Sequence, residues 1–133
     1  MRIAVTGAAG RMGKTLIELV NEAPGVTLGA AFERADSPAI GTDAGDLAGV
    51  GRLGIQVAAD LSANLDSFDL LIDFSVPDAT LALLPLLTDG AKKLVIGTTG
   101  FDAAGQREIE DAAQRIAILK APNMSVGVNV VFK

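Results

Sequence analysis

Short apolar runs alternate along the chain with longer segments in which apolar residues recur at helical spacing. The short runs predict β-strands over 2–6, 26–33, 68–74, 93–96 and 116–119. The longer segments predict helices over 11–22, 75–90 and 102–115. This alternation is typical of parallel strands joined by crossover helices, so the pattern predicts an α/β fold.

Capping and turn residues mark the ends of the expected helices. Pro24 and Gly25 stop the first helix, Ser75 is expected to cap the second, and Gly90 to close it. The segment 36–54 is dense in glycine and lacks periodicity, so we expect a long loop there, with one short strand after it.

The segment 125–133 fits two interpretations. Val126, Val128 and Val130 alternate as in a strand, whereas Ser125 could cap a helix, and the pattern leaves both open. The chain stops directly after an apolar run, which suggests a cut and a sheet that is incomplete at the C-terminus.

The composition limits the chemistry that the chain can perform. Among 133 residues there is no Cys and no His. Disulfides, thiolate zinc sites and cysteine nucleophiles are therefore excluded, and we expect a cytoplasmic protein without a metal site. Carboxylates, lysines and hydroxyls remain for acid–base work.

Charge and hydropathy argue against two classes of partner. The net charge is −5 and the basic residues form no run, which speaks against nucleic acid. The apolar stretch 81–87 contains Pro85 and is far shorter than the roughly 20 residues of a spanning helix, so no membrane partner is expected.

The first predicted strand runs into glycines spaced three apart, at Gly7, Gly10 and Gly13. In a chain with 15 glycines this spacing alone could be an ordinary strand-to-helix turn. Three features favour a dinucleotide site: a strand before it, a helix after it, and Glu33 about 20 residues beyond. We therefore predict a Rossmann-type, doubly wound parallel sheet.

Glu33 and Arg34 stand at the end of the second predicted strand. A carboxylate there can accept hydrogen bonds from an adenosine ribose, which favours NADH, whereas the guanidinium can pair with a 2′-phosphate, which favours NADPH. The alternative is an exposed acid and base at a strand end.

Three further loops follow predicted strands and would share the carboxyl edge of the sheet, where α/β sheets bind ligands. They begin at Asp73, Gly97 and Ala121. Each could equally be a helix-capping turn, and Asn123 could be no more than a cap for the last segment.

Taken together, these strings resemble the dihydrodipicolinate reductase family over essentially the whole chain. The strings are GAAGRMG (7–13), FER (32–34), GTDAG (41–45), DFS (73–75), GTTGFD (97–102) and NMSVGVN (123–129). The resemblance implies a reductase of lysine and diaminopimelate biosynthesis that transfers hydride from NADH or NADPH to a cyclic unsaturated dicarboxylate, giving tetrahydrodipicolinate.

The resemblance also implies roles for residues at matching positions. The expected cofactor contacts are Gly7, Ala8, Ala9, Gly10, Arg11, Met12, Glu33, Arg34, Gly97, Thr98, Thr99, Ala121, Pro122, Asn123 and Met124. Glu33 and Arg34 would distinguish the riboses, Arg11 would assist with a 2′-phosphate, and Thr99 would lie near the substrate.

The chain departs from the family in its catalytic residues. The family's substrate motif, with paired histidines and a nearby lysine, has no counterpart here, since the chain contains no His. We therefore expect a dinucleotide-binding domain over 1–124, the start of a connection to a missing domain over 125–133, and no catalytic residue. The family implies a homotetramer built through that missing domain, and we expect this chain alone to be inactive.

Two other functions fit parts of the sequence. One is a stand-alone module that senses NAD(P) and acts through a partner. The other is a fragment of an extended short-chain dehydrogenase or epimerase, whose opening is similar to residues 6–13, although that family relies on a Tyr and this chain has none.

Overall fold

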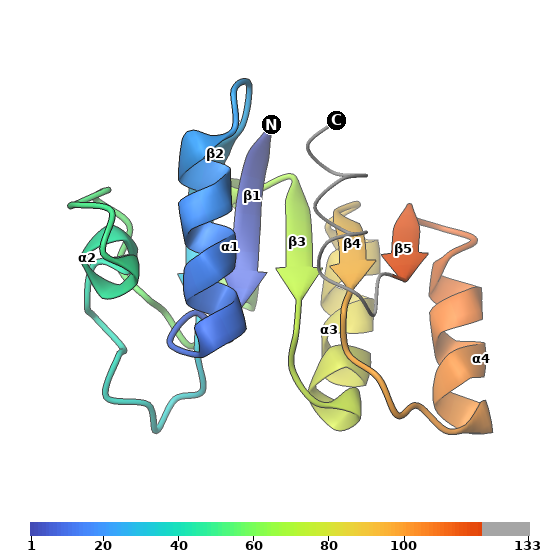
Figure 1. Ribbon diagram of the computed structural model, residues 1–133. Helices are drawn as coiled ribbons and strands as arrows, with labels where there is room; N and C mark the ends of the chain where they lie inside the picture. Colours follow the sequence, from blue (N-terminus) through green and yellow to red (C-terminus); the bar gives the residue numbers. More distant parts are fainter. Residues whose placement is uncertain (121–133) are drawn as a thin grey trace. The chain divides into compact units, whose positions relative to one another are not determined.

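The computed structural model describes residues 1–120 and shows a parallel α/β fold of the Rossmann type (Figure 1). The strand order is β2-β1-β3-β4-β5. The strands are β1 (Arg2–Thr6), β2 (Thr27–Phe32), β3 (Leu70–Asp73), β4 (Lys93–Ile96) and β5 (Ile118–Lys120). The helices are α1 (Arg11–Glu22), α2 (Ala44–Ala48), the 3₁₀ helix η1 (Ser62–Ser67), α3 (Pro77–Asp89) and α4 (Ala103–Ala112). The chain divides into two compact units, 1–71 and 72–133.

In the first unit, β1 pairs in parallel with β2, and α1 packs against both strands (Figure 1). Helix α1 buries the stripe Leu16, Ile17 and Val20, which recurs at helical spacing. Ile17 joins Ala8 and Ala44 in one buried cluster, so α1, the turn before it and the start of α2 share a core.

In the second unit, β4 pairs in parallel with β5, and α3 packs against β4 and α4. Pro77 occupies the first turn of α3, where a missing N–H costs nothing, and Gly90 ends the helix as expected. Leu84 and Leu87 supply its buried face.

Several local expectations differ from the structure, among them the end of α4, which lies at Ala112 and not at Arg115. The glycine-dense segment contains α2, because Asp43 caps a helix there. Ser75 does not cap α3: Val76 is the N-cap, and the Ser75 hydroxyl turns to Asp73 instead. Strand β5 lies at 118–120, slightly later than expected. The segment 125–133 lies outside the described residues. Among residues 1–120, no helix is long and apolar enough to cross a membrane.

Candidate functional site

The glycine turn connects β1 to α1 in a conformation that depends on glycine. Gly7 has φ of 63°, in the left-handed region that residues with a side chain rarely adopt. The N–H of Gly10 donates to the backbone oxygen of Gly7 at 3.0 Å and closes the turn just before α1 begins. The predicted strand, turn and helix are all present.

Gly13 is needed for a separate reason, namely close packing. A Cβ at this position would lie 2.1 Å from the backbone oxygen of Gly7, far inside van der Waals contact. The first turn of α1 therefore lies directly on the glycine turn, and any larger residue would push the two apart. This is the role of the third glycine in the dinucleotide-binding pattern.

The amides of the turn are engaged within the protein. The N–H of Ala8 donates to the backbone oxygen of Phe32 at 3.1 Å, and the N–H of Ala9 donates to Oε2 of Glu33 at 2.9 Å. By contrast, as far as residues 1–120 show, no side chain caps α1 and its first turn holds no acid. The end of the helix thus offers orphan donors and partial positive charge to an anion.

The pair at the end of β2 divides into a fixed acid and a surface base. Glu33 is half-buried, and its Oε1 accepts from the N–H of Arg34 at 3.1 Å while Oε2 holds Ala9. The Arg34 side chain is 85% exposed and makes a 3.4 Å ion pair with Asp36. The first unit therefore brings Glu33 to the glycine turn. Arg11 and Met12 are exposed at the start of α1.

In the second unit, a buried carboxylate organises the loops after β3 and β4. Asp73 is fully buried; its Oδ1 accepts from the Ser75 hydroxyl at 2.8 Å and its Oδ2 from the Thr80 hydroxyl. The Thr98 hydroxyl lies 3.0 Å from that of Thr80 and 3.4 Å from Oδ2 of Asp73, and it accepts the N–H of Ser75 at 3.0 Å. Asp73, Ser75, Thr80 and Thr98 form what we call the hydroxyl network.

The residues of the loop 97–100 differ in how deeply they are buried. Gly97 lies against the ring of Phe74, and a Cβ on Gly97 would meet that ring at 2.0 Å. Thr98 is buried with its hydroxyl in the hydroxyl network, whereas Thr99 is exposed. The structure therefore groups Gly97 and Thr98 with the residues after β3, and it leaves the Thr99 side chain open to solvent.

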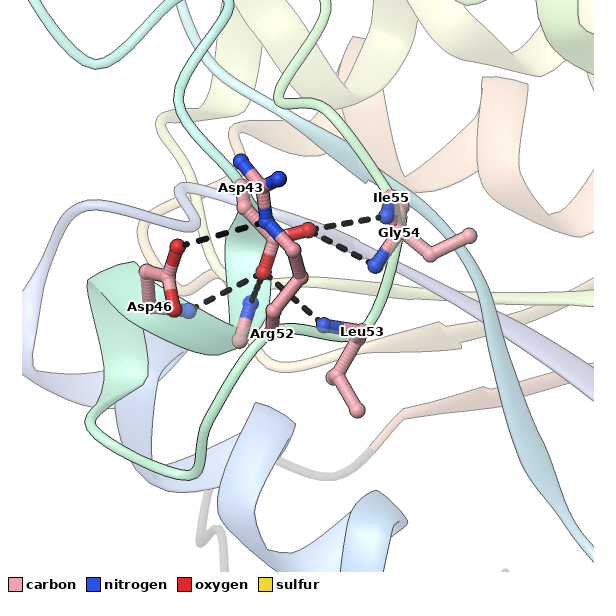
Figure 2. Close-up of polar contacts among 7 residues, drawn as sticks. Asp43, Asp46, Arg52, Leu53, Gly54 and Ile55 are labelled. Atoms are coloured by element: carbon pink, nitrogen blue, oxygen red, sulfur yellow. Dashed lines mark hydrogen bonds and ion pairs between the residues drawn. The ribbon is translucent and has the colours of Figure 1, made fainter.

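A second buried carboxylate, Asp43, was not identified as special by the sequence beyond its place in the string GTDAG. Its two oxygens accept five backbone N–H groups at 2.7–3.2 Å, two from the start of α2 and three from residues 53–55 (Figure 2). The N–H of Leu53, with those of Asp46, Gly54 and Gly45, holds the pKa of Asp43 below its ordinary value, against burial, which raises it. Asp43 thereby fixes the shape of the whole glycine-dense segment.

The remaining predicted contacts, Ala121, Pro122, Asn123 and Met124, lie outside the described residues.

A groove of about 690 Å³ between α3 and α4 is lined by Leu81, Leu84, Pro85, Thr88, Asp89, Glu108, Asp111, Ala112, Gln114 and Arg115. None of these is a predicted site residue, so the chemistry described above lies at the strand ends and not in this groove.

Comparison with known families places these features in context. The family described as dihydrodipicolinate reductase, N-terminus, matches residues 1–124. The chain belongs to this family. The match takes in the glycine turn, the end of β2 and the loops after β3 and β4, and membership favours the reductase over the short-chain dehydrogenase alternative.

Solved structures agree with the fold. A dipicolinate-bound dihydrodipicolinate reductase from Paenisporosarcina sp. TG-14 has a TM-score of 0.75 at 21% identity, covering 96% of this chain and 49% of that one. GenD2 from gentamicin A biosynthesis, in complex with NAD, has a TM-score of 0.72 at 19% identity, covering 92% and 34%. A probable dehydrogenase from Thermotoga maritima has a TM-score of 0.69 at 16% identity, covering 91% and 36%. The chain thus spans less than half of each of these proteins.

Proposed function

We propose that this chain is the NADH- or NADPH-binding part of a reductase of the dihydrodipicolinate reductase type. The observation that carries the proposal is the junction of β1 and α1, where an uncapped helix start lies beside a carboxylate held by the Ala9 N–H at 2.9 Å. Family membership over 1–124 supports it, as does the similar fold of GenD2, whose structure is a complex with NAD.

In this proposal the first unit binds the adenosine half of the cofactor. The pyrophosphate takes the orphan N–H groups of the first turn of α1, since the amides of Ala8 and Ala9 already have partners. Glu33 uses the remaining lone pairs of its carboxylate for the ribose hydroxyls. Because its backbone contacts hold it in place, Glu33 meets the ribose in a fixed orientation.

Arg34 provides the proposed contact to a 2′-phosphate. Its ion pair with Asp36 is exposed on both sides, so exchanging that carboxylate for a phosphate costs little. Arg11, exposed at the start of α1, is proposed to assist. A fixed acid and a movable base together favour use of both NADH and NADPH.

Residues 97–99 and 121–124 of the second unit are proposed to receive the nicotinamide end. Gly97, Thr98 and Thr99 would approach the ring, with Thr99 next to the substrate, and Ala121, Pro122, Asn123 and Met124 would line the cofactor. The bound cofactor supplies hydride to a cyclic unsaturated dicarboxylate, giving tetrahydrodipicolinate for lysine and diaminopimelate synthesis. Dipicolinate in the Paenisporosarcina reductase is a dicarboxylate of this class.

We further propose that the chain by itself binds cofactor weakly and does not turn over substrate. It offers no His for proton transfer, and the acid and substrate clamp of the family would come from a further domain, through which a cytoplasmic homotetramer would assemble.

Calorimetric titration of the chain with NADH and with NADPH tests the proposal. We expect measurable binding of both, and Glu33→Gln should weaken NADH about tenfold by removing a charged acceptor. Glu18→Gln, on the exposed face of α1, is the matched control. Absence of heat with either nucleotide at high protein concentration would refute the proposal.

Arg34→Ala sharpens the assignment of the phosphate contact. We expect it to weaken NADPH more than NADH by about 1.5 to 3 kcal/mol, the worth of a well-formed charged hydrogen bond. Equal losses for the two nucleotides would remove Arg34 from the phosphate site.

A further inference from the structure

The hydroxyl network in the second unit has a feature that packing alone does not require. Three hydroxyls from separate stretches of chain meet one buried carboxylate: Ser75 after β3, Thr80 in α3 and Thr98 after β4. Asp73 also accepts the N–H of Gly97 through its backbone oxygen at 2.8 Å, so its side chain and main chain both hold the loop 97–100.

The network determines which side chain of the loop faces solvent. The Thr98 hydroxyl has partners on three sides, namely the Ser75 N–H, the Thr80 hydroxyl and Asp73, and its side chain is buried. These contacts hold the Thr98 side chain inside the fold, so Thr99 is the threonine of this loop that is left to face solvent. Thr99 is indeed exposed.

We propose that Asp73 and Thr80 are positioning residues for the nicotinamide end of the cofactor. They act through Thr98, whose hydroxyl belongs to the fold and not to the ligand, so the loop meets the ring with its backbone groups and the Thr99 hydroxyl. This inference rests on the proposed function and refines it, since it moves Thr98 from direct contact to support and adds two residues to the site.

Thr80 is the residue to change, because its hydroxyl links Asp73 to Thr98 without lying in the loop. Thr80→Val keeps the shape of the side chain and removes the hydroxyl, and Thr80→Ser keeps the hydroxyl and serves as the matched control. A comparison of two ligands distinguishes binding at the two ends of the cofactor. NADH contains the nicotinamide ring, whereas ADP-ribose contains the adenosine half and lacks that ring.

The chain contains no Trp and no Tyr, so the fluorescence of bound NADH can be followed without interference from strong protein emission. We expect wild-type protein to bind NADH more tightly than ADP-ribose and to shift the emission of the reduced nicotinamide. Thr80→Val should weaken NADH about tenfold and abolish the emission shift. ADP-ribose, measured by competition, should change less than about twofold, and Thr80→Ser should restore both NADH readouts.

Other outcomes overturn the inference in distinguishable ways. If Thr80→Val weakens both ligands equally, or neither, the network is structural only. If wild-type protein binds NADH no more tightly than ADP-ribose, the proposed nicotinamide contact is wrong while the adenosine site stands. If it binds neither ligand, the proposed function itself fails.

Ser75→Ala provides a second variant in case Thr80→Val does not fold. It removes one hydroxyl from Asp73 at a half-buried position and leaves the N–H of Ser75 in place for Thr98. We expect a smaller loss, about two- to threefold, confined to NADH. An equal loss for ADP-ribose would contradict the proposal.

Discussion

The two units each contain a buried aspartate, and within residues 1–120 side-chain hydroxyls donate to the second of these but not to the first. Asp43 accepts five hydrogen bonds, all from backbone N–H groups. The donors that surround the Asp73 carboxylate include the hydroxyls of Ser75, Thr80 and Thr98. Amides have fixed directions, whereas hydroxyls rotate and can accept as well as donate. The amides around Asp43 therefore fix the course of the main chain, whereas the hydroxyls around Asp73 can reorient when their partner changes.

Replacing Asp43 should destabilise the protein more than any change to the hydroxyl network. In Asp43→Asn one oxygen becomes an NH₂ group, which then faces backbone N–H donors that cannot turn away. We expect a larger fall in thermal midpoint than for any variant of Asp73, Ser75 or Thr80, measured by circular dichroism. Asp46→Asn, exposed in the same short helix, is the control and should change the midpoint little. A fall no larger than that of the control would show that the five amides do not depend on the charge.

The pH dependence of stability should follow from the same site. The pKa of Asp43 is lowered in the folded protein from its ordinary value of 3.8, so the folded state binds its proton less readily than the unfolded state. The contribution is thus fully present above that value and is lost as pH falls below it toward the folded pKa. Denaturant unfolding at a series of acid pH values should show this loss in the wild type and a flatter profile in Asp43→Asn. Parallel profiles would contradict the assignment.

Asp73→Asn should be better tolerated than Asp43→Asn. The hydroxyls of Ser75 and Thr80 can turn to accept from the new NH₂ group, so we expect a loss of about 1 kcal/mol in the free energy of unfolding. Urea titration gives the value. A loss as large as that of Asp43→Asn would mean that rotatable donors confer no tolerance, and the comparison would fail.

Ser75→Ala should have the smallest effect on stability. Its hydroxyl donates to Asp73 at 2.8 Å from a half-buried position, where water can take its place, so we expect a loss below about 1 kcal/mol. Thr80→Val in the fully buried part of the network should cost more, about 1 to 3 kcal/mol, because it leaves an acceptor without water. The reverse order in urea titration would contradict the burial argument.

The sequence predicted the elements whose pattern is local. Strands β1 and β4 and helix α1 follow from apolar periodicity and from the glycines at their ends, and α1 begins and ends where expected. The glycine turn and Glu33 could be found because their spacing is a property of neighbouring elements. Their contact at Ala9 could not be foreseen, since it depends on where β2 ends beside β1.

The contacts made over distance were not predicted. Asp43 before Ala44 is a recognisable helix cap, but its bonds to residues 53–55 arise only once the segment folds back. Ser75 was expected to cap α3, and that prediction is wrong: Val76 is the N-cap, and the Ser75 hydroxyl donates to the buried carboxylate of Asp73. In both cases a buried carboxylate accepts hydrogen bonds from groups that the local pattern of the sequence does not pair with it.

The contact between Gly97 and Phe74 has a consequence for engineering the chain. With only 2.0 Å between a new Cβ and the ring, a side chain at position 97 requires the ring of Phe74 to move. Trimming Phe74 first, to Leu or Ala, opens the volume that a side chain at position 97 would fill. The two positions are therefore best varied together, because each new side chain at position 97 takes space that the ring of Phe74 now fills.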